Sequence, residues 1–82
     1  MTDLENLIIK FARDLTKQKN LEITLDTRFK EDLRFDSLST TELILACEEE
    51  FGIEIDIEHP DTAKAKTLRD LYTAVSQLVN SN

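Results

Sequence analysis

Hydrophobic residues recur near the N-terminus at the spacing of an amphipathic helix. From Leu4 to Leu15, apolar side chains return every three or four residues, and charged side chains occupy most of the positions between them. This spacing places the apolar side chains on one face of a helix. Thr2 and Glu5 have the spacing of a capping box, so the first helix is expected to begin here and to end at residues 18–20.

A second helix is predicted from its two ends as well as from its pattern. Asp36 has the side chain of a preferred N-cap, and Gly52 is a common stop after the run from Ser37 to Phe51. Within this run Leu43 and Cys47 are four residues apart, which indicates that this side of the helix is buried. The sequence therefore predicts a helix of about four turns.

The helical spacing returns in the last part of the chain. From Leu68 to Val79 the apolar residues again fall on one face, and Thr67 and Asp70 have the spacing of a cap. Residues 61–66 are expected to form only a short helix or a turn, because a helix of this length is unstable unless it packs against other elements.

Two connections between the predicted helices contain short apolar runs that could be strands but have no partner strand to pair with. The connection from 18 to 36 is expected to be a long loop anchored in the core, because the three-residue run Ile23–Leu25 has no partner strand. Residues 52–58 alternate between polar residues and isoleucine, and they are expected to be extended with Ile53, Ile55 and Ile57 facing the core. The predicted fold class is all-α, a small four-helix bundle of three main helices plus a short third helix, with a long loop between helices one and two.

Composition narrows the classes of protein that the chain can belong to. Its 82 residues leave room for one small core, so residues 1–82 are expected to form a single domain, and a self-contained enzyme is disfavoured. Seventeen acidic against ten basic residues give a net charge of −7, which argues against nucleic acid and anionic membranes as partners. One cysteine and the lack of a long apolar run favour a cytoplasmic monomer without membrane insertion.

The most informative reactive group is the hydroxyl of Ser37, at the predicted start of the second helix. Free backbone N–H groups at such a start favour an anionic substituent, but for an arbitrary Asp-Ser pair a simple helix cap is the favoured interpretation. His59 could in principle act as a base for a hydrolase, but a solvent-exposed histidine is the favoured interpretation. Cys47 is expected to be a packed thiol. No metal site is predicted, because the spacing of a calcium loop is absent.

A longer motif around this serine resembles the acyl carrier protein family. The similar stretches are residues 29–38, then Glu42-Leu43, then residues 48–51. The resemblance implies that Ser37 carries 4′-phosphopantetheine, transferred from coenzyme A, with Asp36 and Leu38 completing the site. Arg34 stands where the family usually has glycine, and if that site needs a positive φ, Arg34 is strained there.

The resemblance also implies what the chain does. It would be a non-catalytic carrier that holds acyl groups as thioesters for fatty acid or related acyl-chain biosynthesis. Its partners would be a phosphopantetheinyl transferase (holo-carrier synthase), acyl transferases and ketoacyl synthases with basic docking surfaces. Two alternatives stay open: a specialised carrier of polyketide or aminoacyl groups, and an unmodified acidic protein-interaction domain.

Two further features of the second helix bear on partners and cargo. Leu38 and Leu45 are seven residues apart, and from the pattern alone they could equally widen the core face. The resemblance favours a docking face in which Glu42, Glu48 and Glu49 surround these leucines. In addition, the small residues of the second helix and the short third helix predict a seam between them for an acyl chain; these residues are Ala46, Cys47, Ala63 and Ala65.

Overall fold

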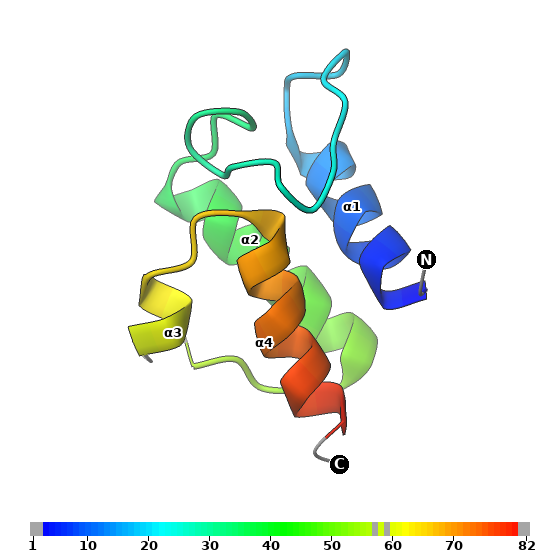
Figure 1. Ribbon diagram of the computed structural model, residues 1–82, viewed down its shortest axis with the longest axis vertical. Coiled ribbons are helices and arrows are strands. Elements are labelled where there is room, and N and C mark those ends of the chain that lie inside the picture. The colour runs from blue at the N-terminus through cyan, green and yellow to red at the C-terminus, as the bar shows by residue number, and fades with distance from the viewer. Residues whose placement is uncertain (1–2, 57, 59, 81–82) are drawn as a thin grey trace.

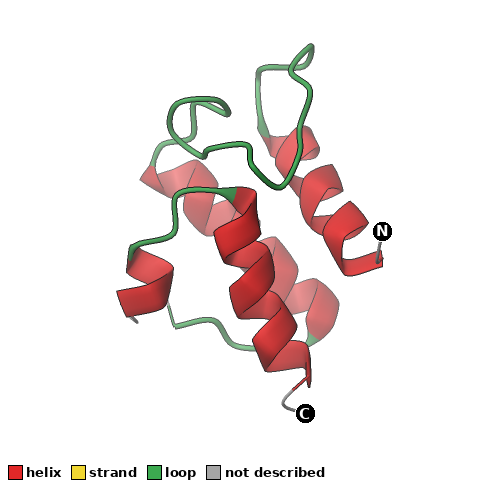
Figure 2. Ribbon diagram, in the orientation of Figure 1, coloured by secondary structure: helices red, strands yellow, loops and turns green. Residues whose placement is uncertain are grey.

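The computed structural model describes residues 3–56, 58 and 60–80. Its helices are α1 (Asp3–Leu15), α2 (Ser37–Phe51), α3 (Pro60–Ala63) and α4 (Leu68–Asn80) (Figure 1). The long helix α1 packs against both α2 and α4, while the single turn of α3 packs against α4. In the part of the chain that is described, Figure 2 shows helices and loops without a strand. The predicted all-α fold is confirmed, with α1, α2 and α4 as the three main helices and α3 as the short one.

Helix α1 has the predicted apolar face but ends earlier than predicted. Ile8 and Ala12 on this face are completely buried. The helix ends at Leu15, so the expected end at residues 18–20 is wrong. Its end is set by Thr16, which is buried and whose hydroxyl donates a hydrogen bond to the carbonyl of Leu33 at 3.0 Å. The same hydroxyl accepts the N–H of Gln18 at 3.1 Å, which turns the chain out of the helix. Thr2, the other half of the predicted capping box, lies outside the described residues.

Helix α2 begins and ends at the predicted residues. The Asp36 carboxylate accepts the backbone N–H of Ser39 at 2.8 Å, which satisfies one of the free donors of the first turn. At the other end Gly52 has φ 64°, and its N–H donates to the carbonyl of Glu48 at 2.9 Å. This left-handed conformation favours glycine and stops the helix.

The connection between α1 and α2 is an anchored loop, as predicted. Four of its apolar side chains are buried, and the segment crosses the start of α4 (Figure 1). At the crossing the N–H of Phe29 donates to the carbonyl of Lys66 at 2.9 Å, and the N–H of Leu68 donates to the carbonyl of Thr27 at 3.0 Å. These bonds flank an isolated antiparallel bridge between Arg28 and Thr67. The buried anchors are Ile23, Phe29, Leu33 and Phe35.

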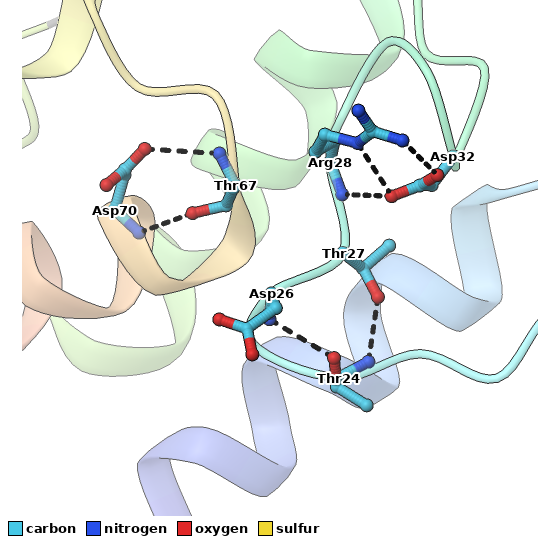
Figure 3. Close-up of polar contacts among 7 residues, drawn as sticks. All are labelled: Thr24, Asp26, Thr27, Arg28, Asp32, Thr67 and Asp70. Carbon is cyan, nitrogen blue, oxygen red and sulfur yellow. Dashed lines mark hydrogen bonds and ion pairs between the residues drawn. The ribbon is translucent and has the colours of Figure 1, made fainter.

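Hydrogen bonds between side chains and the backbone stabilise both crossing segments, the one at Arg28 and the one at Thr67 (Figure 3). The Asp32 carboxylate accepts the backbone N–H of Arg28 at 2.8 Å and pairs with its guanidinium. The hydrogen bond from Arg28 lowers the pKa of Asp32. In the other segment the N–H of Asp70 donates to the Thr67 hydroxyl, while its carboxylate accepts the N–H groups of Thr67 and Lys66. Hydrogen bonds within and between the two segments therefore fix the loop against the start of α4.

The connection after α2 also follows the prediction in part. Ile53 and Ile55 are buried, and the N–H of Ile55 donates to the Glu48 carboxylate at 2.7 Å. Ile57 and His59 lie outside the described residues. The short helix covers Pro60–Ala63 and not the expected residues 61–66. Proline is favoured at the first position of a helix, and the N–H of Lys66 is already bound to the cap of α4.

Candidate functional site

Ser37 is exposed at the first position of α2, and its neighbours hold the backbone firmly. Besides the Asp36 cap, the Thr40 hydroxyl donates to the carbonyl of Asp36 at 3.0 Å, and the Thr41 hydroxyl donates to the carbonyl of Ser37 at 2.8 Å. The N–H of Ser39 also lowers the pKa of Asp36, so this carboxylate is charged at neutral pH. The first turn thus presents the Ser37 side chain to solvent from a fixed backbone.

The loop leading to Ser37 contains one residue in an unfavourable conformation. Arg34 has φ 61°, in the left-handed region that L residues rarely adopt. Its side chain is exposed, whereas those of Leu33 and Phe35 on either side are buried. The N–H of Phe35 donates to the carbonyl of Phe29 at 2.9 Å. The two buried anchors therefore impose the turn at Arg34, at the position where the resemblance described above places glycine.

Ser37 lies on the wall of an open groove of about 660 Å³. One wall is the first two turns of α2, and the other consists of the loop at 29–31 together with residues 62–66. Ala63 and Ala65 of the predicted seam are part of it, but the described lining does not include Ala46 or Cys47, so that half of the seam is wrong. The lining residues are Phe29, Lys30, Glu31, Phe35, Asp36, Ser37, Thr40, Thr41, Ile44, Thr62, Ala63, Lys64, Ala65 and Lys66.

A smaller cavity of about 40 Å³ continues from this groove towards α4. Phe29, Ile44 and Ala65 line both spaces, and Leu43 and Leu71 close the inner one. A second surface hollow of about 650 Å³ lies over Glu48, Glu49 and residues 53–56, but none of the described residues that line it carries a hydroxyl or thiol. The groove beside Ser37 is therefore the candidate site.

Comparison with known proteins identifies the family. The model of the phosphopantetheine attachment site matches residues 6–75. An acyl carrier protein of Rickettsia bellii is 36% identical over 75 residues, covering 92% of this chain and 85% of the relative. The chain belongs to the acyl carrier protein family. An acyl carrier protein of Rickettsia canadensis is 41% identical over 73 residues, covering 89% of this chain and 81% of the relative.

A solved structure agrees with this assignment. Its title describes an acyl carrier protein of Mycobacterium tuberculosis. The two structures superimpose with a TM-score of 0.78 at 32% sequence identity, over 90% of this chain and 96% of the other chain. The family supplies the cofactor, a covalently attached 4′-phosphopantetheine. An exposed serine beside a groove fits such a group, because the attached arm could leave the surface without displacing a buried side chain.

The leucines at 38 and 45 of α2 are exposed on the surface. Leu38 is 65% exposed and Leu45 is 50% exposed, so the alternative that they widen the core is wrong. Glu42 and Glu49 are exposed on the same stripe of the helix. Glu48 differs from them, because it is half-buried and its carboxylate binds the N–H of Ile55. Sequence reasoning missed this structural role, since the contact depends on how the chain turns after Gly52.

Cys47 does not provide an accessible thiol. Cys47 is fully buried, and burial raises the pKa of its thiol to about 12, as expected for a packed cysteine. Within the described ranges no three His, Cys, Asp or Glu side chains gather as metal ligands. Among these same residues, no helix has the length and hydrophobicity needed to span a bilayer.

Proposed function

We propose that Ser37 is the attachment residue and that the chain is a non-catalytic carrier. The observation that supports this proposal is how the four hydroxyl-bearing residues in the first turns of α2 differ in exposure and hydrogen bonding. Ser37 is exposed on the groove, whereas Ser39, Thr40 and Thr41 are half-buried. The hydroxyls of Thr40 and Thr41 also donate to backbone carbonyls. An enzyme acting on this turn therefore meets the Ser37 hydroxyl first.

In the proposed modification, the Ser37 oxygen attacks the phosphorus of coenzyme A that bears the pantetheine. The bond between this phosphorus and the bridging oxygen of the diphosphate breaks, so adenosine 3′,5′-bisphosphate leaves with that oxygen, and the serine proton passes to a base of the transferase. The terminal thiol of the attached group then supplies the thioester chemistry. The chain itself contributes the exposed hydroxyl, the fixed first turn and N–H groups that favour the phosphodiester charge.

The experiment is intact mass spectrometry after incubation with coenzyme A and a broad-specificity phosphopantetheinyl transferase. The wild type and the control Ser39→Ala should each gain the mass of one phosphopantetheine group, and Ser37→Ala should gain none. Modification of Ser37→Ala to the wild-type extent, with the fold intact by circular dichroism, would refute Ser37 as the attachment residue.

We further propose that the stripe formed by Leu38, Glu42, Leu45 and Glu49 docks to basic surfaces of the transferase, acyl transferases and ketoacyl synthases. Exposed leucines supply apolar contact, and the surrounding carboxylates attract a basic partner. Glu48 would add charge at the edge of this stripe, although its carboxylate also accepts the N–H of Ile55.

The stripe is tested by reversing one charge. Glu42→Lys should slow association with the transferase more than the matched control Glu22→Lys, which makes the same charge change on the exposed loop. The difference should shrink as salt increases, because rim charges act mainly on association rates. Equal association rates of the two variants at low salt would rule out docking through this face.

A further inference from the structure

Arg34 is an isolated positive charge in the acidic part of the chain. It is the only lysine or arginine between residues 31 and 61, a stretch that contains eleven acidic residues. Its side chain is exposed, and it lies three residues before the exposed Ser37. The one cationic side chain of this stretch is therefore close in the chain to the proposed attachment residue.

The Arg34 guanidinium has no partner in the part of the chain that the structure describes. None of the hydrogen bonds or ion pairs among the described residues involves its side chain. The carboxylates two residues away on either side have other partners. Asp32 pairs with the guanidinium of Arg28 (Figure 3), and Asp36 accepts the N–H of Ser39. Both carboxylates keep their charge, but neither forms an ion pair with Arg34.

The backbone conformation at Arg34 is also informative. Its φ of 61° is a conformation that glycine adopts at less cost than any residue with a Cβ. Residues held in such conformations are found preferentially at binding and active sites. A strained residue whose side chain makes no contact of this kind within the described fold indicates that the guanidinium binds a group from outside the polypeptide.

The position of Arg34 limits what that group can be. Leu33 and Phe35 are buried, so Arg34 lies on the exposed side of the loop, as Asp36 and Ser37 do. Three residues span at most about 11 Å even when fully extended. An arginine side chain at one end and a substituent on the serine at the other can bridge this distance. Arg34 does not contribute to the described groove lining, so it would meet the first atoms of the arm and not a group inside the groove.

The first charged group of the arm is its phosphodiester, which is an anion at neutral pH. The planar guanidinium of arginine can donate two parallel hydrogen bonds to phosphate oxygens. Asp36 stays charged beside Ser37 and would repel this anion, so a cation within reach offsets the repulsion. A partner enzyme is a less suitable ligand, because the carboxylates of the α2 stripe favour a basic partner surface and Arg34 would repel it.

We propose that the Arg34 guanidinium binds the phosphodiester of the arm and fixes the base of the arm against the loop. The proposal rests on the attachment of the arm to Ser37. Arg34 acts here as a positioning residue, since it restricts the direction in which the arm leaves the surface and does not touch the thiol that carries the acyl group.

The first test compares thermal unfolding before and after modification with coenzyme A and a transferase, with complete modification checked by intact mass. Arg34→Gln removes the charge but keeps the Cβ, so the backbone strain is the same in both proteins. Modification should raise the melting temperature of the wild type by about 1–5 °C more than that of Arg34→Gln, the range expected for one exposed ion pair in a domain of this size. The difference should shrink as salt increases.

The matched control is Arg13→Gln, which makes the same charge change on the exposed side of α1. It should respond to modification as the wild type does. Equal responses of the wild type and Arg34→Gln would overturn the proposal, even if Arg34→Gln alters the rate of association with the transferase. A response lost equally in Arg34→Gln and Arg13→Gln would also overturn it, because overall charge would then explain the effect.

Nuclear magnetic resonance gives a second readout that does not depend on stability. Modification of the wild type should shift the Nε–H signal of Arg34, and the ³¹P signal of the arm should differ between the wild type and Arg34→Gln. Arg34→Lys should give an intermediate ³¹P shift, because it keeps the charge but loses the paired donors. An unchanged Nε–H signal together with identical ³¹P shifts would contradict the contact. Absence of any mass gain in the wild type would refute the attachment at Ser37 itself.

Discussion

Replacing Arg34 with glycine should stabilise the protein, because the native backbone at this position is unfavourable for an L residue. Arg34 has φ 61°, and a side chain with Cβ costs about 1–2 kcal/mol in the left-handed region. Glycine removes this cost but gives the unfolded chain more freedom, which offsets about 0.4–1 kcal/mol. The expected net effect of Arg34→Gly is a gain of about 0.5–1 kcal/mol in the free energy of unfolding.

The matched control is Arg34→Ala, which removes the guanidinium but keeps the Cβ and therefore the strain. Urea and thermal unfolding followed by circular dichroism would compare the three proteins. Arg34→Gly should raise the melting temperature by about 3–6 °C, using the usual shift per kcal/mol for a domain of this size, and Arg34→Ala should stay near the wild type. If the glycine variant is no more stable than the alanine variant, the strain argument at this turn is wrong.

Two further predictions concern groups that brace the loop and the start of α4. Thr16→Val leaves the buried carbonyl of Leu33 without its 3.0 Å hydrogen bond and should cost about 1–3 kcal/mol in urea unfolding, whereas Thr73→Val on the exposed side of α4 should change little; equal costs would contradict this role. Hydrogen bonds from Lys66 and Thr67 lower the pKa of Asp70 below its ordinary 3.8, so its charge stabilises the fold above that pH and the contribution is lost as pH falls through the folded value. Asp70→Asn should therefore melt below the wild type at pH 7 but approach it at low pH, and a pH-independent difference would count against the linkage.

Local signals explain the elements that the sequence predicted well. The bounds of α2 depend on Asp36 and Gly52, whose effects act within one helical turn, so both ends are visible in the sequence. The end of α1 was not predictable in this way. It depends on a hydrogen bond from Thr16 to Leu33, seventeen residues away, and only the folded loop brings the two groups together.

In the candidate site, too, features set by neighbouring residues were predictable and features set by distant segments were not. Ser37 and its cap could be predicted because they are neighbours in the chain, but the lining of the groove could not. Lys30 and Lys66 line the same groove because the segments at Arg28 and Thr67 form a bridge between distant parts of the chain. The leucines at 38 and 45 show a further limit, since their helical spacing is compatible with burial or exposure, and only the packing of α1 and α4 shows that they are exposed.

The most direct test of the central claim is to locate the attached group within the modified protein. Trypsin should release residues 35–64 as one peptide, because no lysine or arginine lies between Arg34 and Lys64. This peptide contains Ser37 together with the competing hydroxyls of α2. Fragmentation by mass spectrometry should place a single phosphopantetheine group on Ser37. Its presence on Ser39, Thr40 or Thr41, or an unmodified peptide after treatment with an active transferase, would contradict the proposed site.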